Sequence, residues 1–234
     1  LYTVISGPDA ADPLTRGIVP ADPMPNLKRG IRGMRLARMP AAEREGVSAE
    51  MLAAYDASLD ILEKLGAEIV EIKLPFRFVD LVTASAVMQA EAYYFNSALA
   101  EDAGKLLGDA VRARLLSGAK LTAQDYLATS HYRAGIKTAL AEAMSGFDAL
   151  LTPTTMHAAI PVDAVDEAIL PSRFTRFGNL LDLCALSLPN GRGAGGLPLS
   201  LQIVCRGFDE ATALRIGYAY QGATDWHEAM PAGI

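Results

Sequence analysis

Residues 34–74 read MRLARMPAAEREGVSAEMLAAYDASLDILEKLGAEIVEIKL, and this segment indicates the class of fold. Its first six residues predict a short apolar strand. Ser48 is a typical N-cap for the helix that follows, whose apolar residues recur every three or four positions, and Gly66 is a typical C-terminal residue. Residues 68–74 alternate between charged and apolar side chains, which is typical of a second strand. A strand, a helix and a strand in succession predict a βαβ unit, and therefore a parallel or mixed sheet.

The rest of the chain predicts an α/β fold in which a mixed β-sheet is flanked by helices, with residues 1–234 as a single unit. Residues 76–145 predict helices, including a long buried helix over Leu81–Leu99. Thr122 and Asp125 resemble a capping box and open a helix that runs to Gly146. The other expected elements are an irregular segment over 1–30, strands over 147–151, 185–188 and 199–205, a Gly-rich connection over 189–196, a loop over 155–173 and a last helix from Asp209 to Gly222.

The composition excludes several classes of partner. The chain has 21 Lys and Arg against 27 Asp and Glu, a net charge of −6 and no basic run, so we expect no nucleic-acid surface. Its apolar stretches are shorter than the roughly 18 to 20 residues of a spanning helix, so we expect no membrane span, and we expect no signal peptide. Cys184 and Cys205 do not make a disulfide framework, which favours a reducing compartment, the cytoplasm. The chain begins at Leu1 without an initiator Met, as if cut from a longer protein.

The residues that could perform chemistry form no recognisable active site by themselves. His131, His157 and His227 lack the spacing of a metal site, so we expect no metal and no cofactor. No serine stands in a nucleophile-elbow pattern, and both cysteines lie in apolar strand contexts that are typical of buried thiols. The glycines of 191–196 precede a strand instead of a helix, which argues against a phosphate-binding loop.

Five segments, in chain order, resemble motifs of the amidase signature family. Residues 174–191, FTRFGNLLDLCALSLPNG, resemble the pattern F-T-x-P-x-N-L-x-G-x-P-A-x-S-x-P-x-G. The sequel G-L-P-x-x-L-Q is matched at 196–202, and FDALLTPT at 147–154 resembles F-D-x-L-L-x-P-T. Shorter matches lie at 118–133 and 7–13. The chain therefore looks like a member of this family, in a branch that resembles allophanate hydrolase and broad amidases.

The resemblance implies one α/β/α domain around a large mixed sheet, in a chain nearly twice as long as this one. Members of the family hydrolyse amides, or pass the amide nitrogen to another acceptor. They use a lysine, a bridging serine and a nucleophilic serine, which lie in a Ser/Gly-rich segment of the N-terminal half. No residue of this chain matches these three, so the resemblance implies a C-terminal portion without catalytic residues, which is inactive alone.

The resemblance also implies where an amide substrate binds. In the family, the loop after the L-L-x-P-T strand and the segment leading into F-T-x-x-x-N approach the active serine. By that analogy the pocket candidates are Thr154, Thr155, His157, Phe174 and Thr175. Asn179 would brace the backbone there, and Arg114, by analogy with glutaminase-type relatives, would bind a substrate carboxylate. The alternative for Arg114 is a solvated helix charge.

Three interpretations stay open at this point. The first is a hydrolase of small-molecule amides, the second is a glutamine amidotransferase subunit with a partner chain, and the third is a non-catalytic module for binding or dimerisation. Hydrophobic residues make up 51% of the chain and charged residues 21%, against about 25% charged in typical domains. We therefore expect an apolar surface that packs against a missing N-terminal half or another copy of the chain, as a homo-oligomer. The family often has Pro, Gly and Pro where this chain has Phe177, Asp182 and Cys184, so the resemblance does not fix a substrate.

Overall fold

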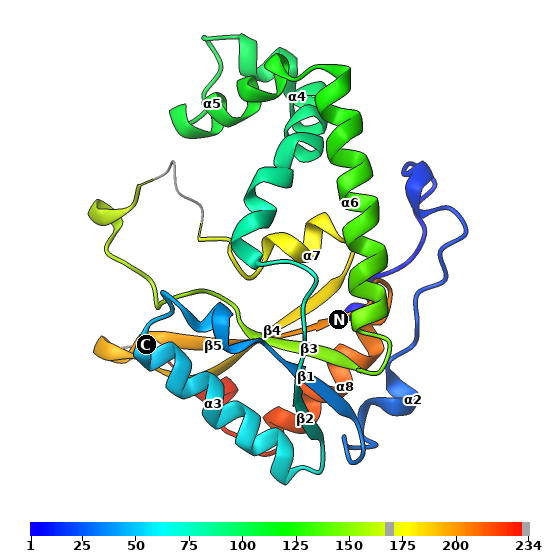
Figure 1. The fold of residues 1–234 in the computed structure, drawn as a ribbon, viewed down its shortest axis with the longest axis vertical. Helices are drawn as coiled ribbons and strands as arrows, with labels where there is room; N and C mark the ends of the chain where they lie inside the picture. Colours follow the sequence, from blue (N-terminus) through cyan, green and yellow to red (C-terminus); the bar gives the residue numbers. More distant parts are fainter. Residues whose placement is uncertain (167–170, 231–234) are drawn as a thin grey trace.

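The computed structural model describes residues 1–166 and 171–230, in which a five-stranded mixed sheet has helices on both faces (Figure 1). Its order is β2-β1-β3-β5-β4. β1 pairs in parallel with β2 and β3, whereas β5 pairs antiparallel with β3 and β4. The predicted α/β class with a mixed sheet is confirmed. The strands are β1 (Arg35–Arg38), β2 (Glu68–Glu71), β3 (Ala149–Pro153), β4 (Cys184–Arg192) and β5 (Pro198–Cys205).

The predicted βαβ unit is present, with α3 (Ala49–Lys64) joining the parallel strands β1 and β2. Ser48 caps the helix, since its hydroxyl accepts a hydrogen bond from the N–H of Met51 at 3.3 Å. Gly66 follows the helix with φ +96°, a left-handed conformation that glycine adopts without side-chain strain. The local sequence therefore determines where this helix begins and ends.

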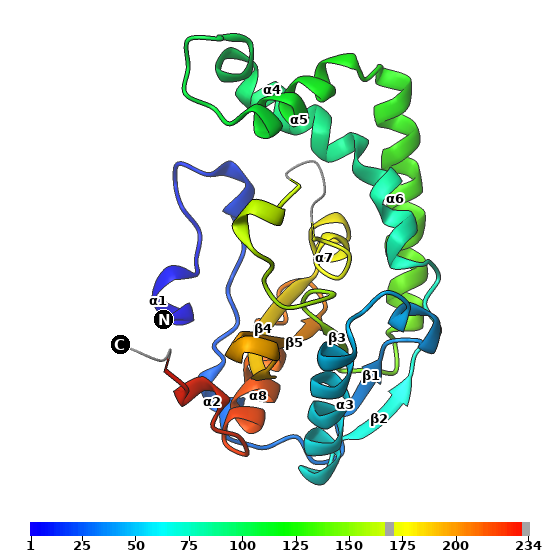
Figure 2. The ribbon, with the colours of Figure 1, turned by 90° about the vertical axis from the view of Figure 1, so that its left-hand side faces the viewer.

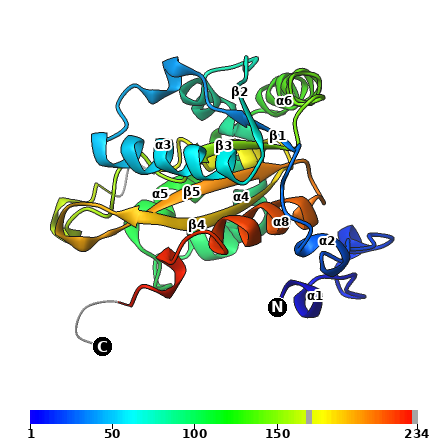
Figure 3. The ribbon, with the colours of Figure 1, turned by 90° about the horizontal axis from the view of Figure 1, so that it is seen from below.

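One face of the sheet is covered by α3 together with α8 (Glu210–Gln221), and both helices contact β4 and β5 (Figure 3). The Ser58 hydroxyl of α3 lies 3.1 Å from the Tyr220 hydroxyl of α8. Asn190 of β4 donates a hydrogen bond to Ser58 Oγ at 3.0 Å, so this buried cluster ties both helices to the outer strand. The predicted last helix is confirmed.

The opposite face is covered by α6 (Ala123–Ala143) and α7 (Arg176–Leu180). Leu140 of α6 and Phe177 of α7 line a cavity with Leu150 of β3, which places both helices over that strand. α6 begins with the predicted capping box, in which the Thr122 and Asp125 side chains each bond to the other residue's backbone N–H. We expected this helix to run to Gly146, but its last residue is Ala143.

α4 (Ala86–Glu101), α5 (Asp109–Ser117) and the N-terminal part of α6 form an arm that extends away from the sheet (Figures 1 and 2). Gly118, which follows α5, lies against α4 so closely that an added Cβ would be 2.2 Å from the carbonyl oxygen of Gln89. Only glycine fits this contact without a shift of one helix relative to the other.

The prediction of one long buried helix over Leu81–Leu99 is wrong in two respects. Residues 78–85 form 3-10 turns, and α4 begins only at Ala86. Tyr94 and Phe95 are then 76% and 78% exposed. The many apolar residues favoured burial, but α4 packs against α5 and α6 and not against the sheet.

The Gly-rich connection is shorter than predicted, because β4 continues to Arg192 and β5 starts at Pro198. The turn is fixed from α3, since the Glu50 carboxylate accepts a hydrogen bond from the Ala194 N–H at 2.7 Å.

The predicted irregular segment over 1–30 contains short helical turns. They are α1 (Tyr2–Ile5), a 3-10 turn at Pro13–Thr15 and α2 (Met24–Leu27).

Candidate functional site

A row of polar side chains crosses β3, β5 and β4 on the face that α6 and α7 cover. Thr152 is the cross-strand partner of Gln202, which is in turn the partner of Ser187, so the three side chains project from the same face. Gln202 Nε2 donates to Thr152 Oγ1 at 3.0 Å and to the carbonyl oxygen of Phe174 at 2.6 Å. Thr152 and Gln202 are buried. Because both donor hydrogens of the amide are used, this buried network fixes the segment before α7 to the sheet.

Thr154 and Ser187 place two hydroxyl groups together where this row meets the surface. Their oxygens lie 2.8 Å apart. The Thr154 N–H donates to the carbonyl oxygen of Ser200 at 3.1 Å, which extends the pairing of β3 with β5 beyond Pro153. Ser187 is exposed on β4, the outer strand of the described sheet. Each hydroxyl can donate and accept a hydrogen bond, so the pair matches the C=O and N–H of an uncharged amide.

The loop after β3 is fixed to the start of α3. The Ser48 N–H donates to the carbonyl oxygen of Met156 at 2.8 Å. The Thr155 hydroxyl donates to the carbonyl oxygen of His157 at 2.8 Å, and His157 Nδ1 lies 2.9 Å from the carbonyl oxygen of Ala158. His157 is exposed. Thr155 and His157 thus follow Thr154 directly in an ordered turn, while residues 167–170 of the predicted loop lie outside the described residues.

A buried ion-pair cluster fixes the far end of the same loop. The Glu43 side chain is 1% exposed and pairs with Arg77 and with Arg173, the latter at 3.2 Å. Arg173 also donates to the carbonyl oxygen of Glu45 at 2.6 Å. Two guanidinium groups compensate the buried carboxylate, and Arg173 is thereby oriented directly before Phe174.

In the segment from Phe174 to Asn179, the backbone and not the aromatic side chain contacts the polar row. The Phe174 ring is fully buried and packs edge-to-face on Phe78, with 5.4 Å between the ring centroids. Its carbonyl group, and not its ring, meets the polar row at Gln202. Thr175 is partly buried next to the start of α7, and Asn179 is exposed.

Arg114 lies in the last turn of α5. α5 is at the end of the helical arm that is farthest from the sheet (Figures 1 and 2). The structure therefore places Thr154, Thr155 and His157 together after β3 and the Phe174 carbonyl against Gln202 of the polar row, and it does not bring Arg114 to them.

Our site candidates did not include Thr152, Ser187 and Gln202. The signal was available, because Ser187 and Gln202 stand at fixed positions of the two quoted motifs that cover 174–202. What the sequence does not state is the register that aligns Ser187 with Gln202 and Gln202 with Thr152.

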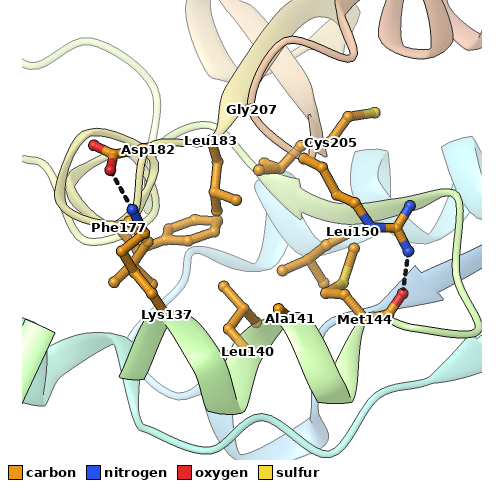
Figure 4. Close-up of a pocket in the computed structure, with 13 residues that line it drawn as sticks. Lys137, Leu140, Ala141, Met144, Leu150, Phe177, Asp182, Leu183, Cys205 and Gly207 are labelled. Carbon is orange, nitrogen blue, oxygen red and sulfur yellow. Dashed lines mark hydrogen bonds and ion pairs between the residues drawn. The ribbon is translucent and has the colours of Figure 1, made fainter. Parts of the chain in front are cut away.

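A separate cavity of about 230 Å³ lies between α6 and the sheet (Figure 4). Asp182 lies at its rim with φ +54°, a left-handed conformation that is rare for a residue with a side chain. Its carboxylate forms ion pairs with Arg133 and Lys137 of α6. Glycine would adopt this conformation without the strain that a Cβ adds. The apolar wall of the cavity includes Leu140, Met144, Leu150, Phe177 and Leu183.

Across residues 1–166 and 171–230, no three His, Cys, Asp or Glu side chains are arranged to bind a metal ion. None of the helices in that same part of the chain has both the length and the hydropathy needed to cross a membrane.

Comparisons with known proteins agree with the motifs. The sequence model of the Amidase family matches residues 1–214. An amidase of Pseudomonas putida is 31% identical over 99% of this chain and 52% of its own length. A glutamyl-tRNA(Gln) amidotransferase subunit of Chloroflexus aggregans is 30% identical over 99% of this chain and 53% of its own length.

The fold agrees as well. The solved structure of Kluyveromyces lactis allophanate hydrolase superposes with a TM-score of 0.80 and 20% identity, over 95% of this chain and 37% of that one. This chain spans about half the length of the two sequence relatives. Because the sequence model of the family matches residues 1–214, which is most of the chain, the chain belongs to the amidase signature family.

Proposed function

We propose that this chain supplies the substrate-binding side of an amide hydrolase whose nucleophile lies in a segment outside these 234 residues. The observation that carries the proposal is the pair of hydroxyls on Thr154 and Ser187, 2.8 Å apart at the sheet edge. Family membership supplies the reaction class, cleavage of a C–N bond in an amide. On this proposal the 234-residue chain has no amidase activity of its own.

The chemistry of the site supports an uncharged substrate. The polar row consists of hydroxyl and amide side chains, and its buried members Thr152 and Gln202 are bonded to each other and to the Phe174 carbonyl. Thr154 and Ser187 are the members that remain near solvent. In our proposal they donate to the carbonyl oxygen of the amide and accept from its N–H, which orients the scissile bond.

The outer strand β4 supports a contact with further protein. Ala185 and Ser187 are exposed on it, although four of the nine residues of β4 are hydrophobic. Exposed outer strands pair readily with other chains. We propose that the remainder of the amidase domain packs here, in a cytoplasmic enzyme, and that an isolated chain associates with a second copy at this edge.

The test compares an amide with the matching ester, because an ester lacks the N–H. The protein used is this chain together with the segment that precedes it in its gene. We expect Thr154→Val and Ser187→Ala to lower kcat/KM for a small aryl amide about two- to tenfold, as loss of one neutral hydrogen bond does. For the ester, kcat/KM should fall by a smaller factor in the same variants. Thr138→Val is the control, because the Thr138 hydroxyl donates to the carbonyl oxygen of Ala134 within α6.

Equal losses for amide and ester would leave the family assignment intact and refute the role of the two hydroxyls. Absence of hydrolysis with every amide tested would refute the hydrolase proposal itself.

A second candidate is a component of a glutamine amidotransferase. The observation in its favour is the 30% identity to a glutamyl-tRNA(Gln) amidotransferase subunit, over the same share of the chain as the amidase match. Glutaminase activity that rises when a small partner protein is added would support this candidate over the first. Activity that needs no partner would exclude it.

A further inference from the structure

Cys184 and Cys205 face each other across two strands. Cys184 is the first residue of β4, Cys205 is the last residue of β5, and the two are direct cross-strand partners. Cross-strand partners project from the same face of a sheet. Ser187 is an odd number of residues from Cys184, so the thiols lie on the face opposite to the polar row.

The spacing of such partners suits a disulfide. Directly opposed residues in antiparallel strands have Cα atoms about 4.5 to 5.5 Å apart. Disulfides span Cα separations of about 4.4 to 6.8 Å. A bond between Cys184 and Cys205 therefore needs no change of strand register.

The two thiols differ in access and in acidity. Cys184 is partly buried and donates to the carbonyl oxygen of Arg206 at 3.2 Å, whereas Cys205 is fully buried. Figure 4 shows the Cys205 sulfur pointing away from the cavity next to it. A hydrogen bond with Cys205 lowers the pKa of Cys184. The same hydrogen bond, together with burial, raises the pKa of Cys205.

The charges around the pair come from three elements. At Cys184 the negative charges of Glu210 and Asp209 oppose ionisation, whereas a hydrogen bond from the Asp209 backbone favours it. At Cys205 the charges of Asp209 and Asp148 oppose ionisation. Tyr2 of α1 donates to Glu210 at 3.2 Å on the same side. At Cys184 the hydrogen bond from Cys205 outweighs burial and the acidic neighbours, so its pKa is lowered, and Cys184 is also the more accessible of the two thiols.

We propose that Cys184 and Cys205 are a peroxide-reactive thiol pair that closes to a disulfide between β4 and β5. The Cys184 thiolate attacks one oxygen of hydrogen peroxide, so that an S–O bond forms, the O–O bond breaks and water leaves after protonation. The Cys205 sulfur then attacks the sulfur of this sulfenic acid. The S–S bond forms as the S–O bond breaks, and the hydroxyl leaves with the Cys205 proton as a second water. Two thiols are oxidised by two electrons and one peroxide is reduced to two waters.

The bond would join the outer strand of the described sheet to its neighbour, three residues before Ser187. In a reducing compartment a cellular dithiol reductant would reopen it.

The test uses the purified full chain, treated with hydrogen peroxide and then with an alkylating agent under denaturing conditions. We expect the intact mass to fall by two hydrogen atoms, both cysteines to resist alkylation, and a non-reduced digest to contain a peptide that joins Cys184 to Cys205. A reductant should restore two alkylated cysteines. If both thiols of the treated wild-type chain are fully alkylated, or if the bond joins two chains, the proposal is wrong.

Two single variants separate the roles of the thiols. Cys205→Ser should accumulate a sulfenic acid at Cys184 that dimedone captures, whereas Cys184→Ser should give no dimedone adduct at Cys205. Dimedone capture at Cys205 in Cys184→Ser, at the rate seen in the other variant, would reverse the assignment. The digest of the wild-type chain shows by itself whether the disulfide forms, so the proposal can be refuted even if a variant fails to fold.

Discussion

The Tyr55 hydroxyl donates a hydrogen bond to the carbonyl oxygen of Leu151 at 2.9 Å, which ties α3 to the middle of β3. The same hydroxyl accepts a hydrogen bond from the Met39 N–H, directly after β1, at 3.1 Å. Tyr55 is 1% exposed. Burial raises the pKa of Tyr55 well above its ordinary value, so the hydroxyl stays protonated and keeps its role as donor. The Tyr55 side chain thereby bonds to two buried backbone groups, the Met39 N–H and the Leu151 carbonyl. Leu151 lies three residues before Thr154 of the candidate site.

Tyr55→Phe should lower the free energy of unfolding by about 2 kcal/mol or more, because it leaves the Met39 N–H and the Leu151 carbonyl without this partner. Urea denaturation followed by circular dichroism measures the change. Tyr218→Phe is the matched control, since Tyr218 of α8 is 44% exposed. Equal midpoints for the two variants would show that the buried hydroxyl contributes nothing.

Glu43→Gln should destabilise the protein by about 3 kcal/mol, because it leaves the guanidinium groups of Arg77 and Arg173 without their carboxylate. The value lies at the low end of the range for buried pairs since the Arg77 side chain is 43% exposed. The control is Glu71→Gln, whose pair with Arg38 is exposed on both sides and should change stability by less than about 1 kcal/mol. A cost for Glu43→Gln no larger than that of the control would contradict a buried cluster at this loop.

Asp182→Ala and Asp182→Gly both remove the ion pairs with α6, but only alanine keeps a Cβ at φ +54°. The alanine variant should therefore be about 1 to 2 kcal/mol less stable than the glycine variant. At Asp60, which is exposed within α3, the order should reverse, because glycine is about 1 kcal/mol worse than alanine inside a helix. If alanine is the more stable substitution at both positions in urea titrations, the left-handed conformation of Asp182 is not strained.

Acid should weaken the start of α6. The Thr122 hydroxyl and N–H donate to the Asp125 carboxylate, and these hydrogen bonds lower its pKa. A carboxyl group with a lowered folded-state pKa contributes stability that is fully present above its unfolded-state pKa, and that is lost as the pH falls through the folded-state value. Thermal melts should therefore show Asp125→Asn less stable than wild type at neutral pH, with the difference disappearing in acid. A difference that persists unchanged below the folded-state pKa would contradict the charged capping box.

The elements that the sequence predicts well are those with local signals. Ser48 and Gly66 determine the two ends of α3, and Thr122 with Asp125 determines the start of α6, through contacts within a few residues of each helix end. The alternation of residues 68–74 overestimated β2, which ends at Glu71, because strand pairing there depends on the short partner β1.

The candidate site depends on contacts that local patterns do not contain. Thr154 and Ser187 are 33 residues apart, and they meet because β5 returns between their strands in antiparallel register. The buried position of the Phe174 ring depends likewise on Phe78, which is distant in sequence. The motifs therefore indicated the correct segments, whereas only the fold shows which atoms of each segment face the site.

The proposal that this chain binds the substrate but lacks the nucleophile is tested by measuring the release of aryl amine from a small aryl amide by two purified proteins. One is the 234-residue chain alone, and the other is the same chain extended by the segment that precedes it in its gene. Our account predicts hydrolysis by the extended protein only. Turnover by the 234-residue chain alone, at a rate that survives repurification and is absent in a mock preparation, would contradict it.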